Sequence, residues 1–173
     1  IYTLQVNQIP LKNISIIKSN IDIASENTNI EQELNWRLGE TINLLGYSLE
    51  TDTVSPGEEI KVTLFWQTDE PITERYKVIV YVLGPFNPET GNPLWGQQDS
   101  EPLNWQLPTT QWPVDTPIQD TYQFTLSSSI SAGEYELGIA MYHITSGERL
   151  VITNENGEEL GNTAILQKIR VSN

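Results

Sequence analysis

Apolar and polar residues alternate along the stretch from Thr41 to Thr68, which is the clearest pattern in the chain. In its second half one set of alternate positions holds Ile60, Val62, Leu64 and Trp66, and the other set holds Lys61, Thr63, Phe65 and Gln67. A period of two is typical of a strand with one face buried. The pattern therefore predicts two strands, joined by a Ser-Pro-Gly turn at 55–57, with Trp66 on the core face.

Short apolar stretches separated by Gly- and Pro-containing turns continue through the rest of the chain. They predict strands at Ile42–Glu50, Glu59–Gln67, Tyr76–Gly84, Leu94–Asp99, Thr121–Ser127, Gly133–His143, Arg149–Ile152 and Ala164–Val171. Strands of this length and spacing, with little helical periodicity, indicate two antiparallel sheets packed face to face. We therefore predict an all-β fold, an antiparallel β-sandwich of about eight strands that is immunoglobulin-like or jelly-roll-like.

The first 35 residues are less regular than the remainder. Apolar alternation indicates strands at 1–6 and 11–23, whereas residues 25–35 have the composition of a loop or a single helical turn. A chain of 173 residues suits one domain. We assign residues 36–173 to the sandwich and treat 1–35 as an N-terminal segment that either adds strands to it or lies outside it. Because the chain opens on Ile1 and not on Met, we expect it to be part of a longer protein.

Acidic residues outnumber basic ones by 23 to 9, which gives a formal net charge of −14. A surface of that sign repels phosphates, so we expect no nucleic-acid partner. The absence of cysteine excludes disulfides, thiolate metal sites and a cysteine nucleophile. No apolar run reaches the roughly 18 residues that a membrane-spanning helix needs.

The longest irregular segment runs from Glu101 to Pro117 and contains Trp105, Trp112 and four prolines. Proline favours extended backbone, so we expect a stiff crossing between the sheets. Asp99 and Asp120 flank this crossing. Because carboxylates accept hydrogen bonds from backbone N–H groups in loops, we predict that both aspartates hold the crossing in place.

Tryptophan offers the strongest indication of a ligand. Trp95, Trp105 and Trp112 lie at or near loops, with Asn104 and Gln106 beside them. Aromatic faces flanked by amides can hold sugars, and an exposed tryptophan without a partner is unusual. We therefore predict a carbohydrate-contact site formed by these five residues, with the alternative that Trp112 plugs one end of the sandwich. Aromatic residues within strands belong to the core instead, and these are Trp66, Tyr81 and Tyr135.

Residues suited to catalysis are sparse. His143 is the only histidine and lies at the end of a predicted strand, where surface or turn packing explains it better than a catalytic triad. Paired carboxylates that could hydrolyse glycosides occur as Asp99 with Glu101, Asp115 with Asp120, and Glu134 with Glu136. That reaction needs two carboxyl groups across a deep cleft, and a sandwich with a filled interior leaves little room for one. We expect no catalytic residues.

Calcium is the metal that the sequence could hold. Asp99, Glu101, Asp115 and Asp120, together with loop carbonyls, supply the oxygen ligands that calcium prefers. Another group, Asn154, Asn156 and Glu158, lacks the first Asp and the last Glu of a calcium loop, and a hairpin turn at Asn156-Gly157 accounts for it. We predict no cofactor and keep calcium at the four acids as an alternative.

A series of motifs follows one another in a characteristic order. They are LLGYSL at 44–49, SPGEEI at 55–60, LFWQT at 64–68, YKVIVYVLG at 76–84, WGQQDSEP at 95–102, PTTQW at 108–112, QDTY at 119–122, AGEYELGIAMYH at 132–143, GERL at 147–150 and NGEELGNTAIL at 156–166. Taken together, residues 38–171 resemble the C-terminal β-sandwich domain of bacterial polytopic membrane proteins that are glycosyltransferase-like, of the dolichyl-phosphate-mannose mannosyltransferase type.

The resemblance implies a non-catalytic accessory domain on the extracytoplasmic face of a bacterial membrane, because in that family the membrane part carries the transfer chemistry. Its partners would be that membrane part of the same parent chain and a glycan or another cell-envelope component. The expected role is contact or weak glycan recognition. A purely structural or protein–protein sandwich is the alternative, and an autonomous hydrolase is a further one that lacks a recognisable acid, base or nucleophile.

Overall fold

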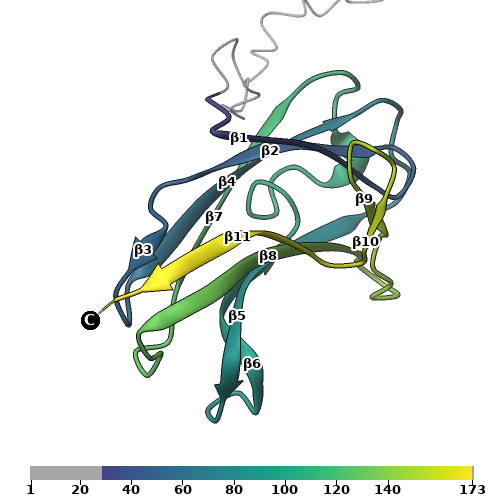
Figure 1. The fold of residues 1–173 in the computed structure, drawn as a ribbon. Coiled ribbons are helices and arrows are strands. Elements are labelled where there is room, and N and C mark those ends of the chain that lie inside the picture. The colour runs from purple at the N-terminus through teal and green to yellow at the C-terminus, as the bar shows by residue number, and fades with distance from the viewer. Residues whose placement is uncertain (1–28, 173) are drawn as a thin grey trace, which may run out of the picture.

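Two packed β-sheets make up the domain in the computed structural model, which describes residues 29–172 (Figure 1). The strands are β1 (Gln32–Leu38), β2 (Ile42–Leu49), β3 (Thr53–Val54), β4 (Glu59–Thr68), β5 (Tyr76–Asn87), β6 (Asn92–Ser100), β7 (Ile118–Thr125), β8 (Gly133–His143), β9 (Ile152–Thr153), β10 (Glu159–Gly161) and β11 (Ala164–Val171). A 3₁₀ turn, η1 (Thr109–Gln111), lies in the crossing between β6 and β7. The predicted antiparallel β-sandwich is confirmed.

Sheet A has the strand order β10-β9-β1-β2-β4-β7, and sheet B has the order β3-β11-β8-β5-β6. Neighbours run antiparallel except for β3 and β11, which pair in parallel. The chain therefore leaves sheet A after β2, contributes β3 to the edge of sheet B, and returns to sheet A as β4. With β4 beside β7 in one sheet and β5, β8 and β11 together in the other, the order is that of an immunoglobulin-like sandwich.

Alternation along the strands fills the space between the sheets with apolar side chains. In β4 the predicted core set of Ile60, Val62, Leu64 and Trp66 is almost fully buried, which confirms the placement of Trp66. Sheet B contributes Val78, Val80, Val82, Leu137 and Ile139 from the other side. The outward-facing Phe65 is also buried, although alternation alone places it on the solvent side. Tyr135 lies in the core as predicted, whereas Tyr81, which was expected there too, is buried on the outer face of sheet B against Gly138.

Residues 29–172 form eleven strands where the pattern predicts about eight. Residues 32–35, expected in a loop or helical turn, form part of β1, which pairs with β2 and is interrupted by a bulge between Glu33 and Trp36. The short β3 and β10 were not expected because two or three residues carry no periodicity. The strands predicted within 1–23 lie outside the described residues.

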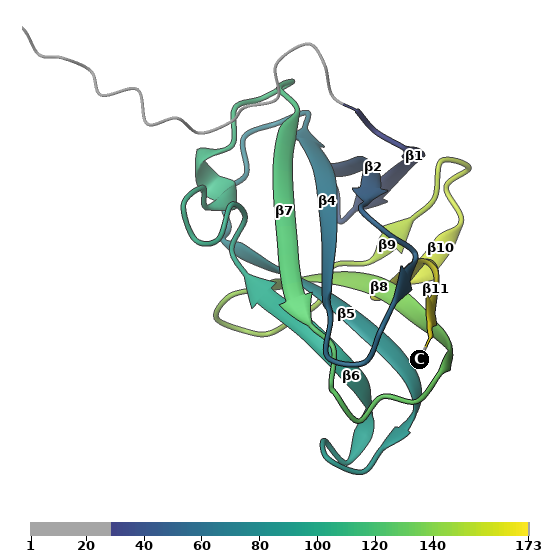
Figure 2. The same cartoon turned by 90° about the vertical axis from the view of Figure 1, so that its left-hand side faces the viewer.

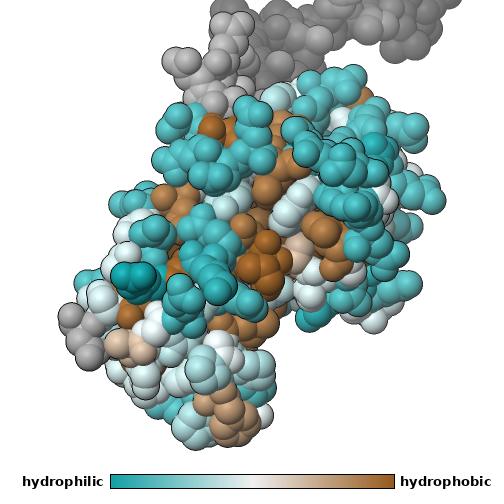
Figure 3. Space-filling model, viewed as in Figure 1, coloured by the Kyte–Doolittle hydropathy of each residue, from teal (hydrophilic) through white to brown (hydrophobic). Residues whose placement is uncertain are grey.

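The edge where β6 and β7 meet is closed by the crossing between them, which Figure 2 shows as a looped segment beside β7. The face seen in Figure 1 shows clusters of hydrophobic residues surrounded by hydrophilic ones (Figure 3). Among the described residues, no helix has the length and apolar character required to cross a membrane.

Candidate functional site

Trp105 is presented to solvent by a strained turn within the crossing. Leu103, Asn104 and Trp105 have φ angles of 53°, 50° and 71°, so three consecutive non-glycine residues adopt the left-handed conformation. This conformation costs on the order of 1–2 kcal/mol per residue and persists only where surrounding contacts impose it. The N–H of Trp105 donates to the carbonyl of Glu101 at 3.0 Å, and that of Gln106 donates to Leu103 at 3.1 Å. The turn thus positions the indole.

The indole of Trp105 lies at one end of the outer face of sheet B. Trp105 is 49% exposed. Lys77 on β5 places Nζ 4.8 Å from the Trp105 ring centroid and 5.7 Å from the ring of Tyr142 on β8. Asp99 on β6 accepts a hydrogen bond from the Tyr142 hydroxyl and lies 3.5 Å from Lys77 Nζ. Together with the exposed Asn104 and Gln106 these residues form what we call the Trp105 patch.

Trp95 and Trp112 do not join this patch. Trp95 is 7% exposed and donates its indole N–H to the carbonyl of Pro85 at 2.8 Å. Trp112 is 5% exposed, lies 6.2 Å from the ring of Trp66, and donates to the carbonyl of Leu107 at 3.3 Å. The expectation that three tryptophans share an exposed face is therefore wrong, because two of them plug the interior.

Asp120 has the geometry that the sequence predicts for holding the crossing. Its Oδ1 accepts a hydrogen bond from the backbone N–H of Leu103 at 2.9 Å, and its Oδ2 accepts one from the Tyr122 hydroxyl at 2.7 Å. The side chain is fully buried. Burial raises the pKa of Asp120 to about 6, although both hydrogen bonds oppose the rise. Burial also raises the pKa of Tyr122 well above its usual value.

Asp99 takes a different place from the one predicted. Its contacts run to Lys77 and Tyr142 on the outer face of sheet B, and not to the backbone of the crossing. The second side chain that holds the crossing, besides Asp120, is Thr109 in η1. Its hydroxyl donates to the carbonyl of Glu74 at 2.7 Å and accepts from the N–H of Tyr76 at 3.1 Å. Asp99 therefore orients Lys77 beneath Trp105.

The four acids considered for calcium do not converge. Glu101 is buried and forms a two-point ion pair with Arg75, in which Arg75 Nε lies 2.9 Å from Glu101 Oε1. Asp99 and Asp120 have the partners described above, and Asp115 is exposed at a left-handed position. Within residues 29–172 no three acidic or histidine side chains gather as a metal site would require. Asn154 Oδ1 accepts from the N–H groups of Asn156 and Glu158, as in a hairpin turn.

His143 is the last residue of β8 and faces the turn that follows it. Its Nδ1 accepts from the N–H of Ser146 at 3.1 Å and lies 3.0 Å from Ser146 Oγ, while Nε2 lies 3.1 Å from Glu74 Oε2. The connectivity is that of a Ser-His-Glu relay, but acyl transfer needs donors aimed at a developing oxyanion. The depression beside Ser146 is lined by the carboxylates of Glu74 and Glu148 and by Arg149, and no hydrogen bond among the described residues aims a donor at a site next to Ser146 Oγ. The arrangement is that of a turn closed by its histidine.

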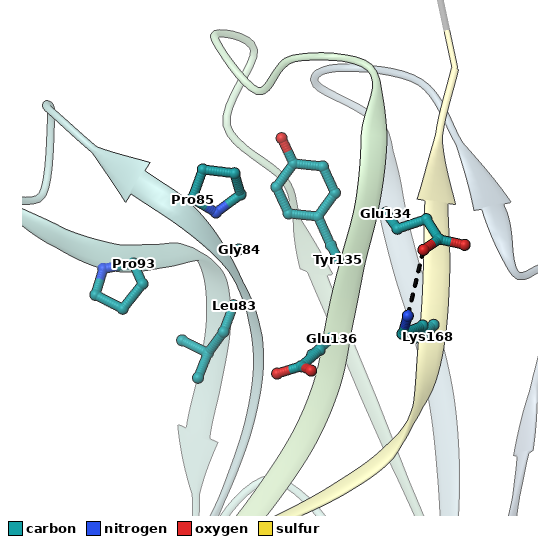
Figure 4. Close-up of a pocket in the computed structure, with 8 residues that line it drawn as sticks. All are labelled: Leu83, Gly84, Pro85, Pro93, Glu134, Tyr135, Glu136 and Lys168. Atoms are coloured by element: carbon teal, nitrogen blue, oxygen red, sulfur yellow. Dashed lines mark hydrogen bonds and ion pairs between the residues drawn. The ribbon is translucent and has the colours of Figure 1, made fainter.

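Two shallow depressions lie further along the outer face of sheet B. One has a volume of about 260 Å³ and is lined by Ile79, Tyr81, Leu83, Gln97, Arg149 and Thr163 among others. The next, of about 490 Å³, lies where β5 and β8 separate (Figure 4). Figure 4 shows Tyr135 between Pro85 and Glu134, with the Glu134–Lys168 ion pair at its rim. Leu83 and Pro93 line both depressions.

Sequence reasoning identified Trp105, Asn104 and Gln106 but missed Lys77 and Tyr142. The available signal was the alternation in β5 and β8, which puts Lys77 and Tyr142 on outward positions, each next to one buried residue, Val78 and Met141 respectively. Which strands lie side by side is not written in a single sequence. The direct pairing of Lys77 with Tyr142 therefore emerges only from the fold.

Comparison with known proteins places the chain by its fold alone. No family model matches it, and no curated protein matches it by sequence. The glycosyltransferase-like parent therefore stays a prediction.

Solved structures with a similar fold exist at low identity. One is the C-terminal domain of Wzt, with 7% identity, a TM-score of 0.49, and coverage of 83% of this chain and 81% of that one. Another is a CARDB domain from Pyrococcus furiosus in complex with di-metal ions, with 14% identity, a TM-score of 0.40, and coverage of 86% and 98%. A third is a Niemann-Pick type C2 protein from the Japanese carpenter ant, at 11% identity and a TM-score of 0.39, covering 78% and 95%.

Proposed function

We propose that this β-sandwich is a non-catalytic accessory domain that recognises glycan through the Trp105 patch. The observation that carries the proposal is the presentation of Trp105. A half-exposed indole is held by three strained residues. A cation lies over its ring. Strain of this kind is concentrated at functional sites, and large exposed aromatics mark binding surfaces.

The chemistry of the patch suits a sugar. A pyranose presents an apolar face that can lie against an indole, and its hydroxyl groups need donors and acceptors at the ring edge. Asn104 and Gln106, on either side of Trp105, expose amides that both donate and accept. Tyr142 and Asp99 add further polar atoms next to the ring. The Lys77–Asp99 ion pair leaves these two charges balanced, so the patch has no strong preference for a charged ligand.

The parent protein belongs to the same proposal. The order of motifs across residues 38–171 supports a domain carried by a glycosyltransferase-like membrane protein, on the extracytoplasmic face of a bacterial membrane. A gene that encodes several apolar helices upstream of Ile1 is the expected finding. A short parent without such helices would contradict this part and leave the glycan proposal standing.

The test is binding to an array of immobilised bacterial envelope glycans. The wild type and a Trp105→Ala variant are compared, with Phe86→Ala as the matched control, because Phe86 is a 67% exposed aromatic at the far end of β5. We expect Trp105→Ala to reduce binding at least tenfold, as for a residue central to an interface, and Phe86→Ala to leave it unchanged. Absence of binding by the wild type, or equal losses in both variants, would contradict glycan recognition and favour a structural or protein–protein role.

A further inference from the structure

The Trp105 patch continues along β5 as a row of outward-facing side chains. Val78, Val80 and Val82 are fully buried in the core. Because strand residues alternate between faces, the residues between and beside them point away from the core, and these are Lys77, Ile79, Tyr81 and Leu83. The row begins beneath Trp105 and ends at the depression drawn in Figure 4. It extends for roughly 20 Å at the usual rise of a strand.

Tyr81 forms a flat floor in the middle of this row. Its ring lies against Gly138 on β8, where an added Cβ would meet Tyr81 Cε2 at 2.6 Å, so only glycine lets the ring approach so closely. The Tyr81 hydroxyl donates to the carbonyl of Ile139 at 3.3 Å, which fixes the ring across the sheet. Tyr81 is 5% exposed yet lines the smaller depression. The ring is therefore a fixed surface at the base of a hollow and not a mobile side chain.

Polar groups border this hollow on both sides. Gln97 on β6 is exposed and pairs with Tyr81 across the strands. Arg149 and Thr163 line the hollow as well. Amide, guanidinium and hydroxyl groups at the edge of an apolar floor are suited to the hydroxyl groups of a second sugar.

Along the row, Lys77 and Lys168 are paired within the sheet, whereas Arg149 at the hollow and Glu136 at the next depression carry opposite charges without an ion pair among the described residues. Lys77 lies 3.5 Å from Asp99, and Lys168 lies 3.3 Å from Glu134. The chain as a whole has a net charge of −14. A polyanionic ligand would therefore be repelled at long range without gaining a cluster of unpaired cations at short range.

We infer that an extended, neutral glycan chain lies along β5, with one sugar against Trp105 and a later one over Tyr81 in the hollow bordered by Gln97. This inference rests on the proposed function, whose Trp105 subsite it lengthens. It predicts that affinity depends on the length of the chain, because a disaccharide reaches the Trp105 patch and a longer chain also reaches Tyr81.

The experiment measures the Kd of neutral linear oligosaccharides of one linkage type, graded from disaccharide to hexasaccharide, by calorimetry. The linkage is the one retained best on the array described above, and length-matched uronic-acid oligomers serve as the charged series. Variants are Trp105→Ala, Gln97→Ala, and Gln119→Ala as the control. Gln119 is an exposed glutamine on the outer face of sheet A, on β7. The folding of each variant is checked by circular dichroism.

We expect affinity to rise at least tenfold from disaccharide to hexasaccharide, and Gln97→Ala to remove most of that gain while leaving the disaccharide Kd unchanged. Trp105→Ala should weaken the binding of oligosaccharides of every length, and Gln119→Ala should leave all of these affinities unchanged. If binding required Trp105 but the Kd were the same for all lengths, or Gln97→Ala left every Kd unchanged, the extended glycan along β5 would be overturned. The proposed function would be retained in either case. Tighter binding of the uronic-acid series would overturn the neutral character of the ligand. If Trp105→Ala bound every oligosaccharide as tightly as the wild type, the proposed function itself would be overturned.

Discussion

The ammonium group of Lys77 lies 4.8 Å from the ring centroid of Trp105, and the two residues come from β5 and from the crossing that follows β6. A cation at this distance is attracted to the electron-rich face of the indole. The ion pair of Lys77 with Asp99 keeps the cation in place. An exposed tryptophan is thus fixed by a half-buried ion pair, which favours a binding role because less conformational entropy is lost when a ligand arrives.

The contact between Lys77 and Trp105 can be measured by a double-mutant cycle. The variants are Lys77→Met, Trp105→Ala and the pair, with the free energy of unfolding determined by urea denaturation for each. We expect a coupling of about 0.5–1 kcal/mol, the usual range for a cation–π contact at a surface. Additive effects would show that the cation does not hold the indole. The control is the same cycle with Lys61→Met in place of Lys77→Met. Lys61 is paired with the exposed Glu50 and not with an aromatic ring.

The exposure of Trp105 predicts how the tryptophan fluorescence responds to acrylamide. Trp66, Trp95 and Trp112 are buried, Trp36 is half-buried, and Trp105 is the most exposed of the five. Trp105→Phe should therefore remove the most accessible component of the emission. Trp112→Phe should leave that component intact and remove emission from a shielded indole. An unchanged quenching curve in Trp105→Phe would show that the indole is covered in solution.

The fold could be predicted from the sequence because its long strands carry a period of two. Strand β8 and strand β11 have the predicted bounds, and β4 differs from its prediction by one residue. Strand β1 was missed since its seven residues, QELNWRL, are largely polar and only its last residue is fully buried. Its position is fixed by pairing with β2 and β9, which no local pattern reveals.

The candidate site was only partly predictable. Trp105 and Trp112 both lie in the same proline-rich crossing, and composition cannot tell which of them faces water. The difference arises from backbone conformation, because the left-handed turn at Leu103–Trp105 directs one indole outward whereas Trp112 packs on Trp66. Asp120 could be foreseen because it flanks that crossing, but its full burial depends on how the sheets pack.

Substitution of Gly138 tests whether ligand binding depends on the position of the Tyr81 ring. In Gly138→Ala the new methyl group would meet the Tyr81 ring at 2.6–2.8 Å and its hydroxyl at 2.9 Å, so the side chain has to shift. Overpacking of this kind typically costs about 1–3 kcal/mol. We expect lower stability, and also weaker binding of the hexasaccharide with an unchanged disaccharide Kd. Gly91→Ala is not a suitable control because of its positive φ, whereas Gly133→Ala has room, the nearest atom being 3.7 Å away.

Asp120 gives the domain a pH dependence with a defined sign. Its pKa is about 6 in the fold and 3.8 in its ordinary environment, so the folded state holds the proton more tightly than the unfolded chain. The stability contributed by the protonated carboxyl is full below pH 4 and is lost as the pH rises through about 6. A difference of about two in pKa between the folded and unfolded states corresponds to about 3 kcal/mol in the free energy of unfolding. The fold tolerates this cost at neutral pH because the carboxylate accepts hydrogen bonds from Leu103 and Tyr122.

Replacement of this carboxyl group by an amide isolates its contribution. Asp120→Asn keeps an oxygen for the N–H of Leu103 and does not titrate. The free energy of unfolding of the wild type, measured by urea denaturation from pH 4 to pH 7, should therefore fall relative to that of Asp120→Asn by up to about 3 kcal/mol. Asp115→Asn, at an exposed left-handed position that asparagine adopts readily, removes one carboxylate as a control and should follow the wild type. Parallel curves for the wild type and Asp120→Asn would show that Asp120 is ionised without cost, and that the crossing is held by its other contacts alone.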